Sequence, residues 1–210
     1  MTGNTDRPQD WASYYEKTRE RPPRETLLFA LDRFDAEPAP AAGKRFAVDL
    51  ACGGGRDTIE LLRRGWRVLA IDAEPAAIEK LTARDDLPAE VDLSSQVARF
   101  EDAVWPNCDL VNSSFALPLM APDDFAAVWP RITGSLNPGG RIACQLYGVH
   151  DSWVGRPGMT FHDRAAVDAL LEGLDVEMLR EEEDDSTTVR GEAKHWHIFH
   201  IVAHKGAAPG

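Results

Sequence analysis

Apolar residues follow a helical period near the N-terminus, and from Arg45 onward the pattern changes to that of strands alternating with helices. The helical repeat comprises Leu27, Leu28, Ala30, Leu31 and Phe34. It predicts an N-terminal helical segment, residues 1–35, that packs on the core. The Pro- and Ala-rich stretch 35–44 has little to bury and is typical of a linker. Residues 45–205 are then expected to form the main domain, giving a single domain overall.

Within residues 45–205, short apolar runs alternate with amphipathic stretches. We expect strands at 45–50, 66–72, 96–100, 108–113, 141–148, 175–180 and 195–203. We expect helices at 57–65, 74–84, 123–136 and 165–174, with Pro130 kinking or ending the third. The stretches NPGG (137–140) and EEEDD (181–185) are expected to form a turn and an exposed acidic loop. This alternation favours a mostly parallel sheet with helices on both faces.

Composition narrows the possible partners. A chain of 210 residues with 43% hydrophobic content is long enough for one domain with a full core. Its 35 acidic and 23 basic residues give a net charge of -12, which argues against nucleic acid as a partner. No stretch has the apolar length of a signal peptide or a membrane span, so we expect no membrane association. Three widely spaced cysteines without a CxxC pair favour a reducing, cytoplasmic setting.

The stretch VDLACGGGRD (48–57) places three consecutive glycines between a buried strand and a helix. Glycines at such a junction let the backbone approach a ligand closely, beside the free N–H groups of the helix start. The dinucleotide pattern G-x-G-x-x-G requires a third glycine where Thr58 stands. The loop therefore predicts a ligand site of another kind.

Asp49, Ala51, Gly53 and Gly55 occupy alternate positions in this loop. This arrangement resembles the first motif of the class I S-adenosylmethionine-dependent methyltransferases, acid-x-Gly-x-Gly-x-Gly, with Ala51 replacing the first glycine. Asp72 closes the next strand 23 positions after Asp49, FEDA (100–103) resembles the family's Asp-Ala pair, and LNPGGR (136–141) resembles its turn before the fifth strand. Within the family, the chain looks most like the tellurite-resistance and thiopurine methyltransferase branch.

The resemblance implies a Rossmann-like three-layer α/β/α sandwich with a seven-stranded mixed sheet whose last strand is antiparallel. It implies S-adenosyl-L-methionine as cofactor, S-adenosyl-L-homocysteine as product, and in-line methyl transfer to a small molecule. Asp72 would bind the ribose hydroxyls, and Asp102 the adenine amino group. The implied cofactor-binding residues are Asp49, Ala51, Cys52, Gly53, Gly55, Asp72, Ala73, Glu101, Asp102, Asn112, Tyr15 and Arg24. We expect Ala51 to keep an ordinary backbone conformation.

Acceptor residues should follow the fourth and fifth strands, because open α/β sheets bind ligands at the carboxyl ends of their strands. The candidate substrate-binding residues are Ser113, Ser114, Phe115 and Trp153. His150 and Tyr147 are the candidate catalytic residues, as a base or as groups that orient the acceptor. Methyl transfer leaves a general base optional, because the cofactor already carries an excellent leaving group.

Several alternatives stay open at this point. Asp49 could simply accept main-chain N–H groups, Asp72 could cap the following helix, and Arg56 and Asp57 could be only a helix-end pair. The protein could be a non-catalytic module that binds the cofactor or its product, or a nucleotide-binding oxidoreductase of the NAD type. It could be a monomer or a homodimer.

Histidines near the C-terminus raise the question of a metal site. His195 and His197 should share one face of the last strand, with His200 on the other. No carboxylate joins them at ligand spacing in the sequence, so we expect no metal.

Overall fold

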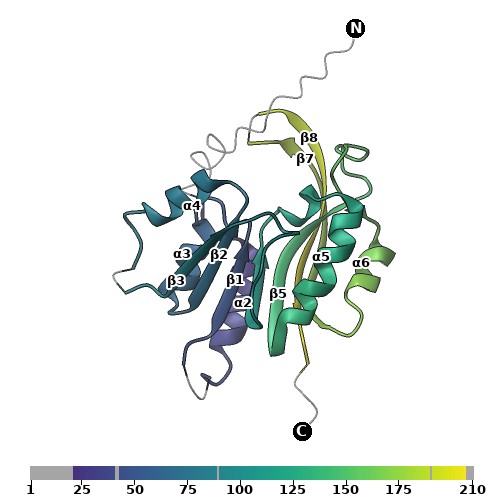
Figure 1. Ribbon diagram of the computed structural model, residues 1–210. Helices are drawn as coiled ribbons and strands as arrows, with labels where there is room; N and C mark the ends of the chain where they lie inside the picture. The colour runs from purple at the N-terminus through teal and green to yellow at the C-terminus, as the bar shows by residue number, and fades with distance from the viewer. Residues whose placement is uncertain (1–20, 41–42, 89, 190, 207–210) are drawn as a thin grey trace.

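The computed structural model describes residues 21–40, 43–88, 90–189 and 191–206 (Figure 1). Its helices are α2 (Glu25–Asp35), α3 (Arg56–Arg63), α4 (Pro75–Thr82), the short 3-10 helix η1 (Leu117–Leu119), α5 (Pro122–Ser135) and α6 (Arg164–Leu170). Its strands are β1 (Phe46–Leu50), β2 (Arg67–Asp72), β3 (Leu93–Val97), β4 (Cys108–Ser113), β5 (Leu136–Gly148), β6 (Phe161–His162), β7 (Asp175–Thr187) and β8 (Ala193–His204). Tyr15, assigned to the cofactor by resemblance, lies outside the described residues.

The strands form one mixed sheet in the order β3-β2-β1-β4-β5-β8-β7. β8 runs antiparallel to both of its neighbours, β5 and β7. The expected seven-stranded sheet with an antiparallel last strand is thus confirmed. The two-residue β6, which pairs with β5 off the main path, is an additional strand that the sequence did not indicate.

Both faces of the sheet are covered, as the alternation predicts (Figure 1). On one face, apolar residues of α2 and α3 pack in a single cluster with Ala47, Leu110, Ala143 and Val202 of the central strands. On the other face, residues of α5 and α6 cluster with the alternate residues of the same strands. β1 is buried at every position, as expected for a parallel strand between two layers. Its one charged residue, Asp49, therefore lies inside the protein.

Two expectations about strands need correction. The third strand is β3, Leu93–Val97, three residues earlier than expected, because Leu93 packs on Leu81 and Ala70 and fixes the register with β2. The stretch 137–140 is part of β5, as an irregularity in its pairing with β4. It still turns tightly, since a Cβ on Gly140 would lie 2.9 Å from the carbonyl oxygen of Asn137.

Two other segments are more regular than expected. α5 continues through Pro130 to Ser135. Pro130 and Ala126, one turn earlier, are both exposed, so water can satisfy the carbonyl group that the proline leaves unbonded. The stretch 181–185 is not a loop but part of β7, paired along its length with β8. Among the described residues, no helix has the length and apolar character that a membrane span requires.

Candidate functional site

The glycine turn, residues 51–55, connects β1 to α3 and has a left-handed backbone at three positions. The φ angles of Ala51, Gly53 and Gly55 are 57°, 54° and 81°. The expectation of an ordinary backbone at Ala51 is therefore wrong, because the turn imposes a positive φ there that normally favours glycine. Packing also favours glycine at position 55, since a Cβ there would lie 2.3 Å from Cδ1 of Leu81 on α4 and would force this buried side chain to move.

Hydrogen bonds brace the glycine turn from three sides. The amide of Gly53 donates to Oδ2 of Asp72 over 2.8 Å, and the amide of Gly55 donates to the carbonyl of Cys52 over 3.0 Å. Arg84, just after α4, donates from Nη1 to the carbonyl of Gly54 over 3.0 Å. Oδ1 of Asp72 accepts the amide of Glu74 over 2.9 Å. Asp72 thus joins the glycine turn to the residue before α4, but it does not cap this helix, whose N-cap is Glu74.

A buried network of carboxylates lies beneath the turn. Oδ2 of Asp49 accepts the Thr58 hydroxyl over 2.5 Å, and Oδ1 accepts Nδ2 of Asn112 over 2.8 Å. The same Nδ2 lies 3.2 Å from Oδ2 of Asp57, which also accepts the Ser114 hydroxyl over 2.5 Å. One amide group on β4 therefore bridges two carboxylates from β1 and α3.

Asp57 is more than the partner of Arg56 at a helix end. Its Oδ1 accepts Nε of Arg56 over 3.2 Å and the main-chain amide of Arg24 over 3.1 Å. With its bonds to β4, this carboxylate links the N-terminal side of α2, the start of α3 and the end of β4. The sequence suggested only a local pair, because its other partners lie far away along the chain.

Burial and the neighbouring charge of Asp57 raise the pKa of Asp49 to about 7. Hydrogen bonds from Thr58 and Asn112 oppose this rise because they stabilise the ionised form. Asp49 and Asp57 are neighbouring carboxylates that are both buried away from water, so a cation placed beside them would stabilise their charges. Asp49 is therefore not a simple acceptor of main-chain N–H groups, since the Thr58 hydroxyl and the Asn112 amide donate to it.

The network also has acceptor groups left over. Oδ1 of Asn112 and the hydroxyl of Ser113 are buried and have no hydrogen-bond partner within the described part of the chain. A buried polar atom without a partner is costly, so a ligand that donates hydrogen bonds is favoured here. An ammonium group would supply both the positive charge beside the two carboxylates and the missing hydrogen-bond donors, because it is a cation with three N–H groups. The amino-acid part of S-adenosylmethionine carries such a group, and these residues fit it.

The sequence placed three aromatic residues at the acceptor, and the structure brings them together. Phe115 follows β4 with a φ of 59°, held by its amide, which donates to Oε1 of Gln145 over 3.0 Å. Its ring centroid lies 6.3 Å from that of Tyr147, which in turn lies 6.1 Å from that of Trp153. The guanidinium of Arg24 lies 4.3 Å above the Phe115 ring. We call Phe115, Tyr147 and Trp153 the aromatic wall.

Lys194 adds a feature that the sequence analysis missed. Its ammonium is ion-paired with Asp151, both side chains are fully buried, and it lies 4.1 Å from the Trp153 ring and 4.2 Å from the Trp196 ring. Burial lowers the pKa of Lys194, although the Asp151 carboxylate opposes this shift. The only sign of this buried ion pair in the sequence was the presence of a lysine in β8, a strand otherwise rich in apolar and aromatic residues. Its partner stands 43 residues away, so no local pattern revealed the pair.

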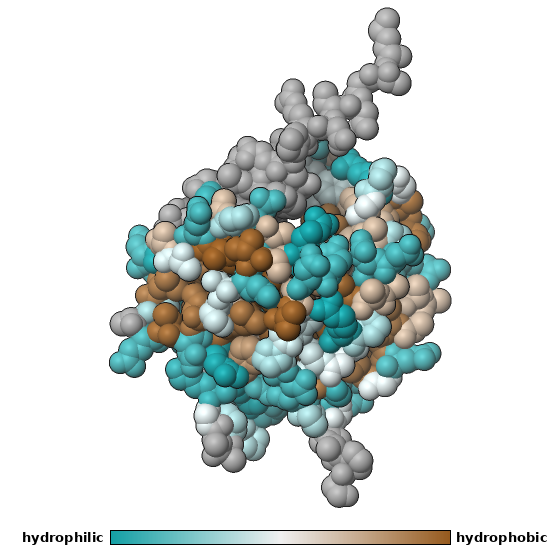
Figure 2. Space-filling model, in the orientation of Figure 1, coloured by the Kyte–Doolittle hydropathy of each residue, from teal (hydrophilic) through white to brown (hydrophobic). Residues whose placement is uncertain are grey.

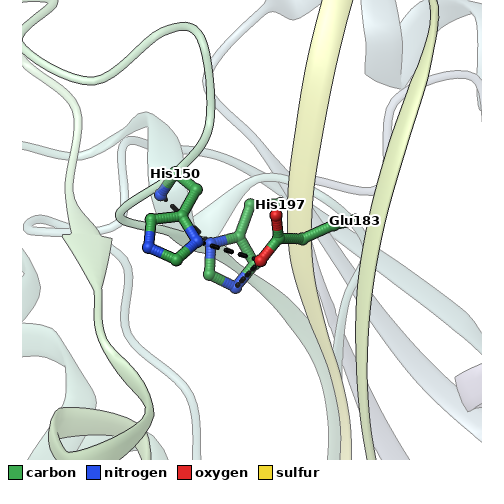
Figure 3. Close-up of side chains that lie close together, drawn as sticks. All are labelled: His150, Glu183 and His197. Atoms are coloured by element: carbon green, nitrogen blue, oxygen red, sulfur yellow. Dashed lines mark hydrogen bonds and ion pairs between the residues drawn. The ribbon is translucent and has the colours of Figure 1, made fainter.

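The other candidate catalytic residue, His150, lies against the β7–β8 hairpin (Figure 3). Its Nδ1 is 2.9 Å from Oε1 of Glu183, and its main-chain amide donates to Nδ1 of His197 over 3.1 Å. The two rings stack with centroids 4.8 Å apart. Within the described residues, these bonds join His150 to the hairpin, not to the glycine turn. The side chain is 62% exposed, so Nε2 is accessible to a ligand.

The expectation that no carboxylate meets these histidines is wrong, because β7 supplies several. The ligand atoms of His150, Glu183 and His197 lie within 4.8 Å of one another, and Nε2 of His197 is 3.0 Å from Oε1 of Glu181. His195 meets Asp185 over 2.8 Å. However, Nδ1 of His197 accepts a main-chain N–H, so its proton is on Nε2 and faces Glu181. To bind a metal ion, Nε2 of His197 would need a free lone pair, and the proton occupies that position. The three side chains are therefore better described as a hydrogen-bonded network.

The residues assigned to ribose and adenine flank the ends of β2 and β3. Ala73 and Asp102 are exposed, and Glu101 is half-buried. Arg131 on α5 donates to the carbonyls of Glu101 and Ala103, which fixes the turn that carries Asp102. Cys52 is buried in the glycine turn, consistent with a small filler there.

Residues 47–140 match the family model described as a methyltransferase domain. The described fold is similar to that of TehB from Haemophilus influenzae, with a TM-score of 0.72 at 14% identity, covering 91% of this chain and 65% of that one. Through residues 47–140, the chain is similar to the class I S-adenosylmethionine-dependent methyltransferases.

The methyltransferase domain is 29% identical over 122 residues to a carboxy-S-adenosyl-L-methionine synthase from Klebsiella pneumoniae, covering 54% of this chain and 49% of that protein. It is 31% identical over 134 residues to a trans-aconitate 2-methyltransferase from Methylobacterium radiotolerans, covering 63% of this chain and 46% of that protein. The chain therefore spans about half the length of the curated relatives that it matches. S-adenosylmethionine is the cofactor of the family.

Proposed function

We propose that this protein transfers the methyl group of S-adenosylmethionine to a small molecule held against the aromatic wall. The observation that carries the proposal is the buried network beneath the glycine turn, where Asp49 and Asp57 share one amide of Asn112. Two buried carboxylates and an unpartnered amide oxygen suit the ammonium group of an amino acid.

The remaining cofactor groups have candidate partners nearby. Asp72 is the proposed ligand of the ribose hydroxyls, because its carboxylate lies at the end of β2 directly beside the glycine turn and a carboxylate can accept two hydroxyl groups. The turn bearing Glu101 and Asp102 is the proposed neighbour of the adenine. When bound, S-adenosylmethionine supplies an activated methyl group and a neutral thioether as leaving group.

The chain's own contribution is to position the acceptor and to exclude water. An acceptor held against the aromatic wall would present its attacking lone pair to the methyl group of the bound cofactor. An acceptor that carries a proton must also lose it. We propose His150 for this step, because donation from Nδ1 to Glu183 leaves Nε2 free to accept a proton.

A small acceptor is supported by the charge of the chain and by the residues around the aromatic wall. A net charge of -12 opposes the approach of a nucleic acid backbone. Each ring of the aromatic wall has a cationic side chain beside it, Arg24 on Phe115, Arg156 on Trp153 and Lys194 on Tyr147 and Trp153, which suits a small anionic acceptor. One relative is named for a small carboxylic acid, trans-aconitate.

The decisive experiment is incubation with methyl-labelled cofactor and a panel of thiols, amines, carboxylic acids, tellurite and selenite, followed by mass analysis. We expect a labelled small-molecule product. Calorimetry should also show that Asp72→Ala weakens cofactor binding by roughly 1.5–3 kcal/mol, the range for a lost charge-assisted bond. Unchanged affinity would refute the ribose assignment. Tight binding without any labelled product would support the non-catalytic module instead.

A further inference from the structure

The two edges of the sheet differ sharply in charge. β7, at one edge, carries eight charged residues among its thirteen. β3, at the other edge, has the sequence LSSQV and carries none. Exposed sheet edges are usually protected by charged side chains, because their free N–H and C=O groups pair readily with other strands. The β7 edge has this protection, and β3 lacks it.

Apolar side chains surround the β3 edge. Val97 on the strand is 51% exposed, and Val91 and Val104 beside it are 42% and 73% exposed. Val104 is tied to the strand, since its amide donates to Oε1 of Gln96 over 3.3 Å. Figure 2 shows hydrophobic surface on the side of the molecule where β3 and α4 lie. Exposed apolar residues next to an open edge are typical of an interaction surface.

The direction of the main-chain groups on β3 follows from its pairing with β2. The carbonyl of Asp92 accepts the amide of Val68, and the amide of Ala98 donates to the carbonyl of Asp72. Because successive residues of a strand face opposite sides, the even-numbered residues between them also face β2. Leu93, Ser95 and Val97 therefore direct their main-chain N–H and C=O groups outward.

This outward set is self-complementary about Ser95. In an antiparallel pair of β3 strands related by a two-fold axis, Ser95 lies opposite Ser95, and Leu93 lies opposite Val97 of the second copy. All three positions have outward main-chain groups, as hydrogen-bonded pairs of an antiparallel ladder require. Ser94 lies opposite Gln96, so apolar residues meet apolar ones and polar residues meet polar ones.

We propose that β3 is a dimerisation surface at which two copies of this chain join their sheets edge to edge. The pairing is isologous, so it closes at two copies. Each chain has a net charge of -12, and long-range repulsion between the copies opposes the pairing. Salt screens that repulsion, so the dimer strengthens as ionic strength rises.

Sedimentation velocity on the full chain tests this, over a range of protein concentrations at roughly 0.05 M and 0.5 M salt. We expect a concentration-dependent dimer that is more populated at the higher salt. Ser95→Lys places two like charges opposite each other and should raise the dissociation constant by at least roughly tenfold. Ser95→Glu should do the same. An equimolar mixture of the two variants should restore dimers, because the mixed pair brings opposite charges together at the axis.

Ser186→Lys is the matched control, because Ser186 is an exposed serine on the other edge strand, β7. It should leave the dissociation constant unchanged. Ser95→Cys should form a disulfide between two chains on mild oxidation and Ser186→Cys should not; the native cysteines are buried. A wild-type chain that stays monomeric at every concentration and salt level would overturn the proposal. So would folded Ser95→Lys protein that dimerises as well as the wild type.

Discussion

Replacing Asp49 with asparagine should stabilise the folded protein above neutral pH and lower its affinity for the cofactor. The substitution keeps the side chain's shape and removes a buried charge. Its amide oxygen can still accept the bond from Asn112, and its NH₂ group can donate to the Thr58 hydroxyl, which then acts as acceptor. The variant therefore isolates the effect of ionisation at one buried position.

The sign follows from the raised pKa. Folding raises the pKa of Asp49 from 3.8 to about 7, so between these values the native state holds a proton that the unfolded chain has released. The free energy of unfolding of the wild type accordingly falls as pH rises through this window and levels off above it. A shift from 3.8 to about 7 corresponds to roughly 4 kcal/mol at full ionisation. We expect Asp49→Asn to recover about 2–4 kcal/mol at pH ~8 and little at pH ~4.

Urea unfolding of the cofactor-free protein at several pH values between these limits measures the effect. Asp184→Asn serves as control, since it removes an exposed carboxylate from β7 and should not alter the pH profile. Calorimetry on the same Asp49→Asn sample should show weaker binding of S-adenosylmethionine, because the substitution removes one of the two carboxylates proposed to bind its ammonium group. A stability difference between variant and wild type that stays constant from acid to neutral pH would refute the buried-charge argument.

Three further substitutions test other parts of the structure. His150→Ala should lower turnover more than cofactor affinity, and steady-state kinetics that match the wild type would remove the histidine from the reaction. Gly55→Ala should lose about 1–3 kcal/mol more stability than Gly65→Ala, because both positions have a positive φ but only at Gly55 would a Cβ meet Leu81; equal losses in chemical unfolding would contradict the packing argument. Lys194→Met should lower the free energy of unfolding by about 3–5 kcal/mol in the same assay, because it leaves the buried carboxylate of Asp151 without its ion-pair partner. An unchanged free energy of unfolding would contradict this argument.

Much of the fold could be predicted because its elements carry strong local patterns. β4 has the bounds that its apolar run indicates, and α4 begins at Pro75, a residue suited to the first turn of a helix. β3 was misplaced because LSSQV has no apolar alternation and its position depends on pairing with β2. The acidic stretch 181–185 was taken for a loop, since the histidines that pair with it on β8 are distant in sequence.

In the candidate site, too, residues in a local motif could be predicted, whereas residues that depend on distant partners could not. The positions of Asp49 and Asp72 follow from a compact motif, and the structure places both beside the glycine turn. The central role of Asp57 was not visible, because its partners Asn112 and Ser114 lie more than fifty residues away. The positive φ of Ala51 was likewise missed, because an alanine in a sequence gives no sign of backbone strain.

The bracing of the glycine turn has a consequence for how a ligand is captured. Gly53, Gly54 and Gly55 are each anchored by a hydrogen bond within the protein, so the loop is ordered during folding and little of its conformational entropy remains to be lost on association. The glycine turn is therefore preorganised for binding. Slow amide hydrogen exchange at Gly53 and Gly55 in the ligand-free protein would be its signature.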